Sequence, residues 1–186
     1  YLKPEGRKLH MIVRVPLKAM RDIVFPEFGP GYLDIARLTP QLPDTATLWL
    51  ADFVALYENR ARLPKPTIRA IQLSIASDRS FESYEQALAH VTAPPLTNSA
   101  NVVWNQVLLD VLFEYPIQSE TSAFSIHTGW RHLAANVTTV LRFVTNGTTR
   151  AFEFTADPGL VPLDPRWHQA AWRFIEGGFL HILDGT

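Results

Sequence analysis

The sequence contains no cysteine. Disulfide bonds, thiol catalysis and cysteine-ligated zinc sites are therefore excluded, although the compartment is not fixed, since exported proteins can also lack cysteine. The chain also has no excess of one charge: 17 Lys and Arg residues stand against 18 Asp and Glu residues. Because neither sign gathers in a patch, we expect no nucleic-acid partner and no polybasic membrane segment. No run within the chain reaches the roughly 18 consecutive apolar residues of a membrane span.

Motifs for nucleotide and hydrolase chemistry are missing as well. No glycine-rich loop follows a predicted strand, which argues against nucleotide binding, and there is no G-x-S-x-G elbow. What remains is a chain of 186 residues with ordinary globular composition, 47% hydrophobic and 19% charged, which is enough for one core. It begins at Tyr1 with neither a methionine nor a signal peptide, so we expect a processed or excised piece of a longer protein.

Alternating apolar residues predict several strands. Residues 8–16 (KLHMIVRVP) alternate with a period of two and end at a proline, which is typical of a strand. Two β-rich runs flank Asn146-Gly147, the dipeptide of a type I′ hairpin, in which both central residues must adopt positive φ. Residues 68–76 are expected to return beside residues 53–57 after a turn at residues 58–60. Further strands are expected at residues 23–25, 32–35, 101–117 and 122–130.

Helix signals are fewer. Asp44 or Thr45 can cap one helix, and Ser80 can cap a second that continues to residue 91. Pro165 suits the first turn of a third helix at residues 165–186. Roughly seven to nine closely spaced strands with two or three short helices predict a mainly β fold, an antiparallel β-sandwich of immunoglobulin-like type. We assign residues 1–164 to this sandwich domain and residues 165–186 to a C-terminal helix.

Histidines are the natural candidates for a metal site. His127 and His132 flank Trp130 and could ligate zinc or nickel together with a carboxylate from elsewhere. Their spacing is not specific for a metal, and the alternative is a pair of partly exposed loop histidines. Ser125, His127 and Asp110 have the residue types of a hydrolytic triad. Without an elbow or an oxyanion loop, however, we do not expect a hydrolase.

Acidic and aromatic residues have simpler interpretations. A glycosidase needs two carboxylates at a set separation, which a sequence does not show. We therefore interpret as a solvated face the acidic residues Asp78, Glu82, Glu85, Asp110 and Glu114. Aromatic residues at these spacings are more often core than a ligand platform. We assign to the core the aromatic residues Trp49, Phe53, Tyr57, Phe113 and Tyr115.

The end of the chain carries a family resemblance. Residues 163–186, LDPRWHQAAWRFIEGGFLHILDGT, resemble the segment that leads into the first membrane helix of the HupE/UreJ family. These multi-span membrane proteins are regarded as nickel or cobalt permeases, and their larger members carry an exported soluble domain. Residues 15–38, 77–91, 108–117 and 157–167 resemble that exported domain, so the resemblance covers nearly the whole chain.

The resemblance implies a non-enzymatic domain at the periplasmic or extracellular face of the membrane, anchored by C-terminal spans that follow it. His181 matches the first histidine of the family's metal motif, whose other ligands would lie beyond Thr186. Nickel or cobalt would then belong to the full-length protein. His127, His132 and His168 could capture the ion, or a periplasmic protein could be the partner. From the residues alone, the alternative is a soluble β-sandwich binding module for a protein or carbohydrate.

Overall fold

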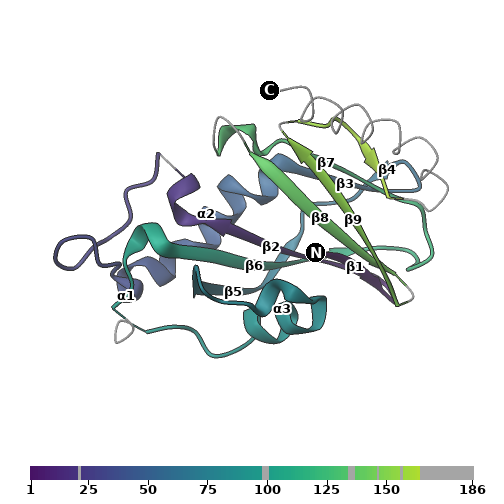
Figure 1. The fold of residues 1–186 in the computed structure, drawn as a ribbon. Helices are drawn as coiled ribbons and strands as arrows, with labels where there is room; N and C mark the ends of the chain where they lie inside the picture. The colour runs from purple at the N-terminus through teal and green to yellow at the C-terminus, as the bar shows by residue number, and fades with distance from the viewer. Residues whose placement is uncertain (21, 98–100, 134–136, 146, 156, 164–186) are drawn as a thin grey trace, which may run out of the picture.

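Two β-sheets packed face to face form the body of the molecule (Figure 1). The computed structural model describes residues 1–20, 22–97, 101–133, 137–145, 147–155 and 157–163. The first sheet has the order β5-β6-β2-β1-β8-β9 and the second β10-β7-β3-β4. The first contains β1 (Leu2–Glu5), β2 (Lys8–Pro16), β5 (Thr67–Ile75), β6 (Val107–Pro116), β8 (Thr138–Thr145) and β9 (Thr148–Thr155). The second contains β3 (Val54–Glu58), β4 (Ala61–Arg62), β7 (Phe124–Thr128) and β10 (Val161–Pro162).

Strand direction confirms the predicted fold class. Neighbouring strands pair antiparallel in both sheets, except for β1 and β8, which run parallel at one register position. Few short helices accompany the strands, so the mainly β, antiparallel sandwich expected from the sequence is the fold of the described residues.

The main core lies between the sheets and is built by strand alternation. Leu9 and Met11 of β2, with Phe113 and Tyr115 of β6, point inward and are at most 2% exposed. This confirms the strand predicted at residues 8–16 and the core assignment of both aromatic residues. Trp49 and Tyr57 are half-buried. The assignment of Phe53 is wrong: this residue is 40% exposed, and its ring stacks on His132 at the surface.

Two tight turns connect neighbouring strands. Gly147 has a φ of 75° between β8 and β9, as the predicted hairpin requires, and Asn146 lies outside the described residues. Asn59 and Arg60 have φ values of 50° and 72° between β3 and β4, which confirms the turn predicted there. Positive φ at both central residues matches the twist of the flanking strands.

The partner of β5 differs from the prediction. Residues 68–76 do not return beside β3, because β3 pairs instead with the short β4. β5 belongs to the other sheet and pairs with β6. Pro64 and Pro66 lie between β4 and β5. Proline lacks the N–H that a continuing ladder needs, so the chain leaves the second sheet at this point.

Local structure also departs from the prediction between β2 and β3. Residues 23–25 and 32–35 form no strands, because the prolines and glycines of this region interrupt a ladder. Isolated bridges and loop hydrogen bonds connect it instead. The chain then enters α1 (Ile35–Leu38) and α2 (Leu42–Trp49). α2 begins before Asp44 and Thr45, so neither residue is its N-cap.

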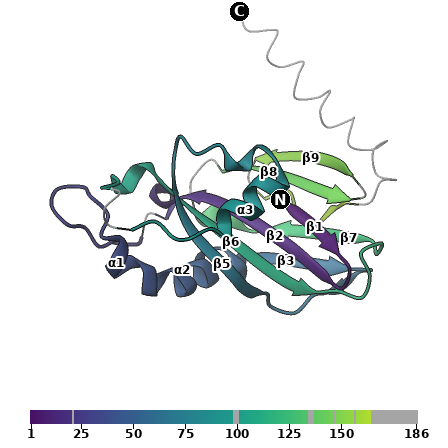
Figure 2. The ribbon, with the colours of Figure 1, turned by 90° about the horizontal axis from the view of Figure 1, so that it is seen from below.

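Helix α3 (Tyr84–Val91) packs on the outer face of the six-stranded sheet (Figure 2). Ser83 caps it by accepting a hydrogen bond from the Gln86 amide at 3.2 Å, so the cap predicted at Ser80 is wrong. Ser80 opens a 3-10 turn just before the helix. A small second core joins helix and sheet. It consists of Tyr1, Ile12, Tyr84, Ala87, Val91, Leu112 and Val144.

Register determines which polar residues face α3. Ile12 lies opposite Leu112 in the β2–β6 pair, and two residues further along Arg14 lies opposite Asp110. Because side chains alternate along a strand, Arg14 and Asp110 share the outer face with that small core. The helix predicted at residues 165–186 and the domain boundary at 164 lie outside the described residues.

Candidate functional site

A partly buried group of polar side chains lies between α3 and the six-stranded sheet. We call it the α3 cluster, and its members come from three strands, the turn after β5 and the helix. They are Arg14, Ser74, Asp78, Ser80, His90 and Asp110.

Asp110 is the centre of the α3 cluster. Its side chain is 0% exposed, so the interpretation of Asp110 as part of a solvated face is wrong. Arg14 donates from Nε to Oδ1 and from Nη2 to Oδ2, both at 2.7 Å, and the Ser74 hydroxyl donates to Oδ2 at 2.9 Å. A bidentate guanidinium supplies two charge-assisted hydrogen bonds, which are stronger than neutral ones. These bonds compensate for removing the charge from water.

Asp78 extends the α3 cluster toward the surface. It accepts from Arg14 Nη2 at 2.8 Å and from the Ser80 amide at 2.9 Å, with a further short bond from the Ser80 hydroxyl. Burial alone would raise the pKa of Asp78, but the hydrogen bonds from Ser80 and Arg14 outweigh it and lower the pKa to about 2. Phe81 stacks beneath the Arg14 guanidinium at 3.9 Å from its ring centroid. Arg14 is therefore fixed on both sides.

His90 links the cluster to α3. Its Nε2 lies 3.1 Å from Oδ2 of Asp110, and its Nδ1 lies 3.6 Å from Oδ2 of Asp78. The Nε2 atom is buried and has no partner in hydrogen-bond geometry. The His90 ring and the Asp110 carboxylate are thus at ion-pair distance, and the strength of their attraction depends on the charge of the ring.

The chemistry of the α3 cluster is structural. The Ser80 hydroxyl donates a hydrogen bond to Asp78, and a carboxylate with a pKa near 2 is a poor general base around neutral pH. Ser74 donates to Asp110, whose other bonds come from a guanidinium. Among the described residues, neither hydroxyl is hydrogen-bonded to a histidine, so the arrangement they form does not activate a serine nucleophile. It holds α3 against three strands.

The predicted metal-site histidines lie away from the α3 cluster: His127 is on β7 of the second sheet, and His132 is in the 3-10 turn Trp130–His132 that follows β7. His127 Nε2 is 2.9 Å from Oδ1 of Asp157. The Gly159 amide and His127 together hold the pKa of Asp157 below its usual range. His132 instead stacks on Phe53, with ring centroids 3.7 Å apart. Both of its nitrogens lie 3.2 Å from backbone carbonyl oxygens, those of Gly129 and Trp49. A metal at His132 would have to displace one of these contacts.

Within the described ranges, no group of three or more His, Cys, Asp or Glu side chains converges to hold a metal ion. His168 and His181 lie outside those ranges, so the metal role of the histidines stays a prediction. The triad residues are not brought together. Asp110 contacts Arg14, Ser74 and His90, whereas His127 contacts Asp157.

A second polar group, which the sequence reasoning did not identify, surrounds His10. Its Nδ1 lies 3.0 Å from the Tyr84 hydroxyl and 3.2 Å from Oε2 of Glu5, and its Nε2 lies 3.4 Å from Oε2 of Glu114. Lys8 pairs with the same Glu114 oxygen at 3.1 Å. Like the α3 cluster, this group ties α3 to the sheet.

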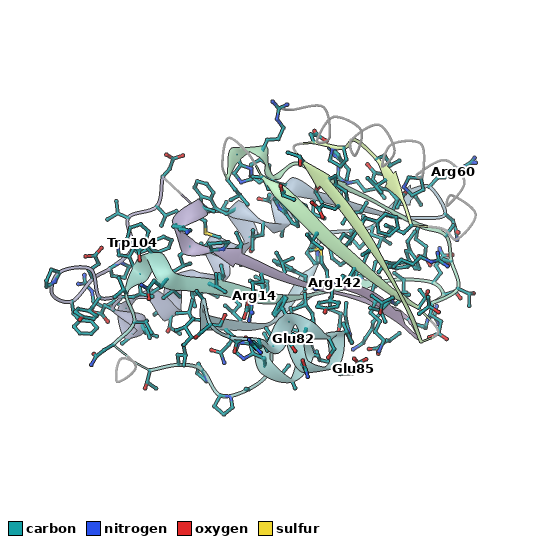
Figure 3. All side chains as sticks on the ribbon, in the orientation of Figure 1. Arg14, Arg60, Glu82, Glu85, Trp104 and Arg142 are labelled. Carbon is teal, nitrogen blue, oxygen red and sulfur yellow. The ribbon has the colours of Figure 1, made fainter. Side chains whose placement is uncertain are left out.

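A cavity of about 330 Å³ opens between β2 and β8. We call it the β2–β8 cavity. Apolar side chains form its floor, among them Ile126, Leu133 and Leu141. Arg14 and Arg142 both line it, and Figure 3 labels the two residues. Arg142 donates to the Phe81 carbonyl oxygen at 3.2 Å, and no ion pair joins it to a carboxylate of the described residues.

Exposed aromatic side chains gather on a loop at residues 24–33, which stands away from both sheets (Figures 1 and 2). Phe28 and Tyr32 are 37% and 39% exposed, and their rings stack with centroids 5.9 Å apart. The loop is braced by hydrogen bonds from the Phe28 amide to the Tyr32 carbonyl at 2.9 Å and from the Leu33 amide to the Val102 carbonyl at 2.9 Å. The aromatic pair is thus held in a defined position at the surface.

Removing Asp110 should destabilise the fold strongly. Asp110→Ala leaves a buried guanidinium without its main counter-charge, and we expect a loss of about 3–5 kcal/mol in the free energy of unfolding. Urea denaturation followed by circular dichroism measures this. Asp52→Ala is the matched control, since it breaks an exposed pair with Lys65 and should change stability by less than about 1 kcal/mol. Similar small losses in both variants would contradict the structural role of the cluster.

Asp78 should make stability depend on pH in the acid range. The pKa of Asp78 is lower in the folded protein than in the unfolded chain, so its contribution is present above about pH 4 and is lost as pH falls toward about 2. We expect wild type to exceed Asp78→Asn in stability at neutral pH by an amount that shrinks by roughly 1–2 kcal/mol on acidification. Denaturation curves of both proteins at several pH values measure it. A difference that stays constant with pH would refute this assignment.

Comparison with known proteins gives no match: no family model, no curated protein and no solved structure matches this chain. The resemblance to the HupE/UreJ family therefore stays a prediction. Within the part of the chain that the structure describes, no helix is long and apolar enough to cross a membrane. Function has to be argued from the residues and their geometry.

Proposed function

We propose that this chain is the extracytoplasmic, non-enzymatic domain of a HupE/UreJ-like membrane protein and that it serves nickel or cobalt transport by binding a protein partner. The sequence resemblance supports the family and the location. The arrangement of the α3 cluster supports a non-enzymatic role, because its acids and hydroxyls are all engaged in holding a helix.

The braced aromatic loop is the observation that carries the binding role. Stacked, half-exposed aromatic rings on a loop that is itself hydrogen-bonded supply large contact area at low entropic cost. Aromatic residues are enriched at the centres of protein interfaces for this reason. Val24, 95% exposed, adds apolar surface to the same loop.

Metal capture by the domain is the weaker version of the proposal. Nickel and cobalt sites need several imidazole or carboxylate ligands that converge on one point. His127 and His132 have separate partners: His127 contacts the Asp157 carboxylate, whereas the ring nitrogens of His132 contact backbone carbonyl oxygens. Capture through His127, His132, His168 and His181 would need ligands from residues beyond the described ranges.

The sequence of the gene beyond the codon for Thr186 tests the proposed family and the proposed location at the membrane. We expect the reading frame to continue into several long apolar spans, with an aspartate-histidine pair near their start. Sequencing the source gene decides this. A stop codon directly after Thr186 would remove the membrane proposal. The chain would then be interpreted as a soluble binding module that uses the same loop for a protein or carbohydrate partner.

The aromatic loop should matter for transport by the full-length protein. Replacing Phe28 and Tyr32 together by serine removes the stacked pair without touching the core, and we expect nickel or cobalt uptake at limiting metal to fall roughly fivefold, as loss of an interface anchor does. Leu48→Ser is the matched control, because Leu48 is 60% exposed on α2, outside the loop. Uptake equal to wild type in the double variant would show that the loop is not the binding surface.

A further inference from the structure

The sheet is incomplete between β2 and β8. β2 pairs with β6 along its whole length, but with β1 only from Lys8 to Met11, and Ile12 pairs with Tyr1. β8 pairs with β9 throughout and meets β1 at one position, Leu2 with Phe143. Beyond Tyr1, no strand of the described residues lies between the facing edges of β2 and β8.

The β2–β8 cavity lies where that strand position continues. Residues 11–16 of β2 and residues 137–142, which lead into and form β8, line its two sides. β1 runs antiparallel to β2 and parallel to β8, so a line extended from Tyr1 passes residues 13–16 on one side and residues 138–141 on the other. Four residues opposite positions 13–16 would span about 13 Å at the usual rise of a strand.

Backbone geometry at Tyr1 is that of a residue inside a ladder. Its nitrogen donates to the Ile12 carbonyl oxygen at 2.8 Å, and its carbonyl oxygen accepts from the Ile12 amide at 2.9 Å. These are the two bonds of a hydrogen-bonded antiparallel pair. The position is buried, and burial together with the charge of Arg142 lowers the pKa of an amino group there to about 5. A peptide N–H makes the same bond with no charge to bury.

The open edge of β2 offers further ladder groups. The backbone N–H and C=O of Ile12 both point toward β1. In an antiparallel strand every second residue points its backbone groups to the same side, so those of Arg14 and Pro16 also point there. Arg14 has both an N–H and a carbonyl to offer, whereas Pro16 has only a carbonyl. The ladder on this side therefore ends at Pro16.

We propose that the β2–β8 cavity is a strand site, occupied in the natural protein by polypeptide that is joined to Tyr1 and continues β1 on its amino side. This inference does not depend on the proposed function. The occupant lies antiparallel to β2 and parallel to β8. It closes the gap and makes the six strands of the first sheet continuous from β5 to β9.

Register specifies the chemistry of the occupant. The first and third residues before Tyr1 lie opposite Val13 and Val15 and point inward onto the apolar floor, so they are apolar. The second lies opposite Arg14 and points outward, near Arg14 and Arg142. Arg14 is already paired with Asp110 and Asp78. Arg142 donates from Nη1 to the Phe81 carbonyl oxygen but has no carboxylate partner among the described residues, so an acidic or neutral polar side chain fits this position.

A cross-link in the protein made from its natural gene, including the residues encoded before Tyr1, tests the proposal. Residues 1–186 contain no cysteine, so no thiol of these residues competes with the introduced pair. Val15→Cys is combined with cysteine at the third residue before Tyr1. Residues opposite each other in a non-hydrogen-bonded pair have Cα atoms about 4.5 Å apart, which suits a disulfide. The control combines Val15→Cys with cysteine at the second residue before Tyr1, which points to the opposite face.

We expect the first pair to form an intrachain disulfide nearly completely under mild oxidation and the control pair to form none, as measured by mass spectrometry of unreduced peptides. Absence of the disulfide in the first pair, or a disulfide between two copies of the chain, would overturn the proposal. So would an initiator codon directly before Tyr1.

Hydrogen exchange provides a second measurement that needs no cysteine. The amide of Arg14 should exchange at least about tenfold more slowly in the natural protein than in a chain that begins at Tyr1. Only in the natural protein does this amide donate a hydrogen bond to a neighbouring strand. Equal exchange rates would also overturn the proposal. Neither result depends on what the gene encodes after Thr186, so failure here is distinct from failure of the transport proposal.

Discussion

The bidentate ion pair between Arg14 and Asp110 is the interaction on which the rest of the structure depends. It joins two neighbouring strands of the larger sheet, β2 and β6, on the face that α3 covers. A carboxylate with no exposed surface is tolerated only when its oxygens are fully bonded. Arg14, Ser74 and the nearby His90 surround both oxygens. Such a pair adds little stability compared with an apolar core, but it forms only in a register that places Arg14 opposite Asp110.

Much of the fold could be predicted because its signals are local. The alternation in residues 8–16 and the turn chemistry of Asn146-Gly147 are contained in a few neighbouring residues, and each predicts a strand or a hairpin without knowledge of the rest. The partner of β5 could not be predicted in this way. A strand of that composition pairs equally well with either sheet, and the choice is made by Pro64 and Pro66 and by the long-range match with β6.

The candidate site was harder to predict for the same reason. Asp110 lies in an otherwise largely apolar strand, and aspartate is a residue type usually found at the surface. Only the β2–β6 register places it opposite Arg14. Once two strands are known to pair, a basic residue on one and an acidic residue directly opposite it on the other predict an ion pair. The six histidines show the converse. His127 and His132 attract attention by their closeness in sequence, yet His10 and His90, far apart along the chain, are the ones held near carboxylates under α3.

Arg14 connects the two unusual features of the molecule. Its guanidinium belongs to the α3 cluster, while its side chain also lines the β2–β8 cavity and its backbone lies on the open edge of β2. A strand placed in that cavity would exclude water from the outer side of the guanidinium and lower the local dielectric. The attraction between Arg14 and Asp110 strengthens as water is removed, provided that every donor keeps its acceptor. Completion of the sheet and docking of α3 are therefore coupled through one residue, and the helix is held most firmly when the sheet is continuous.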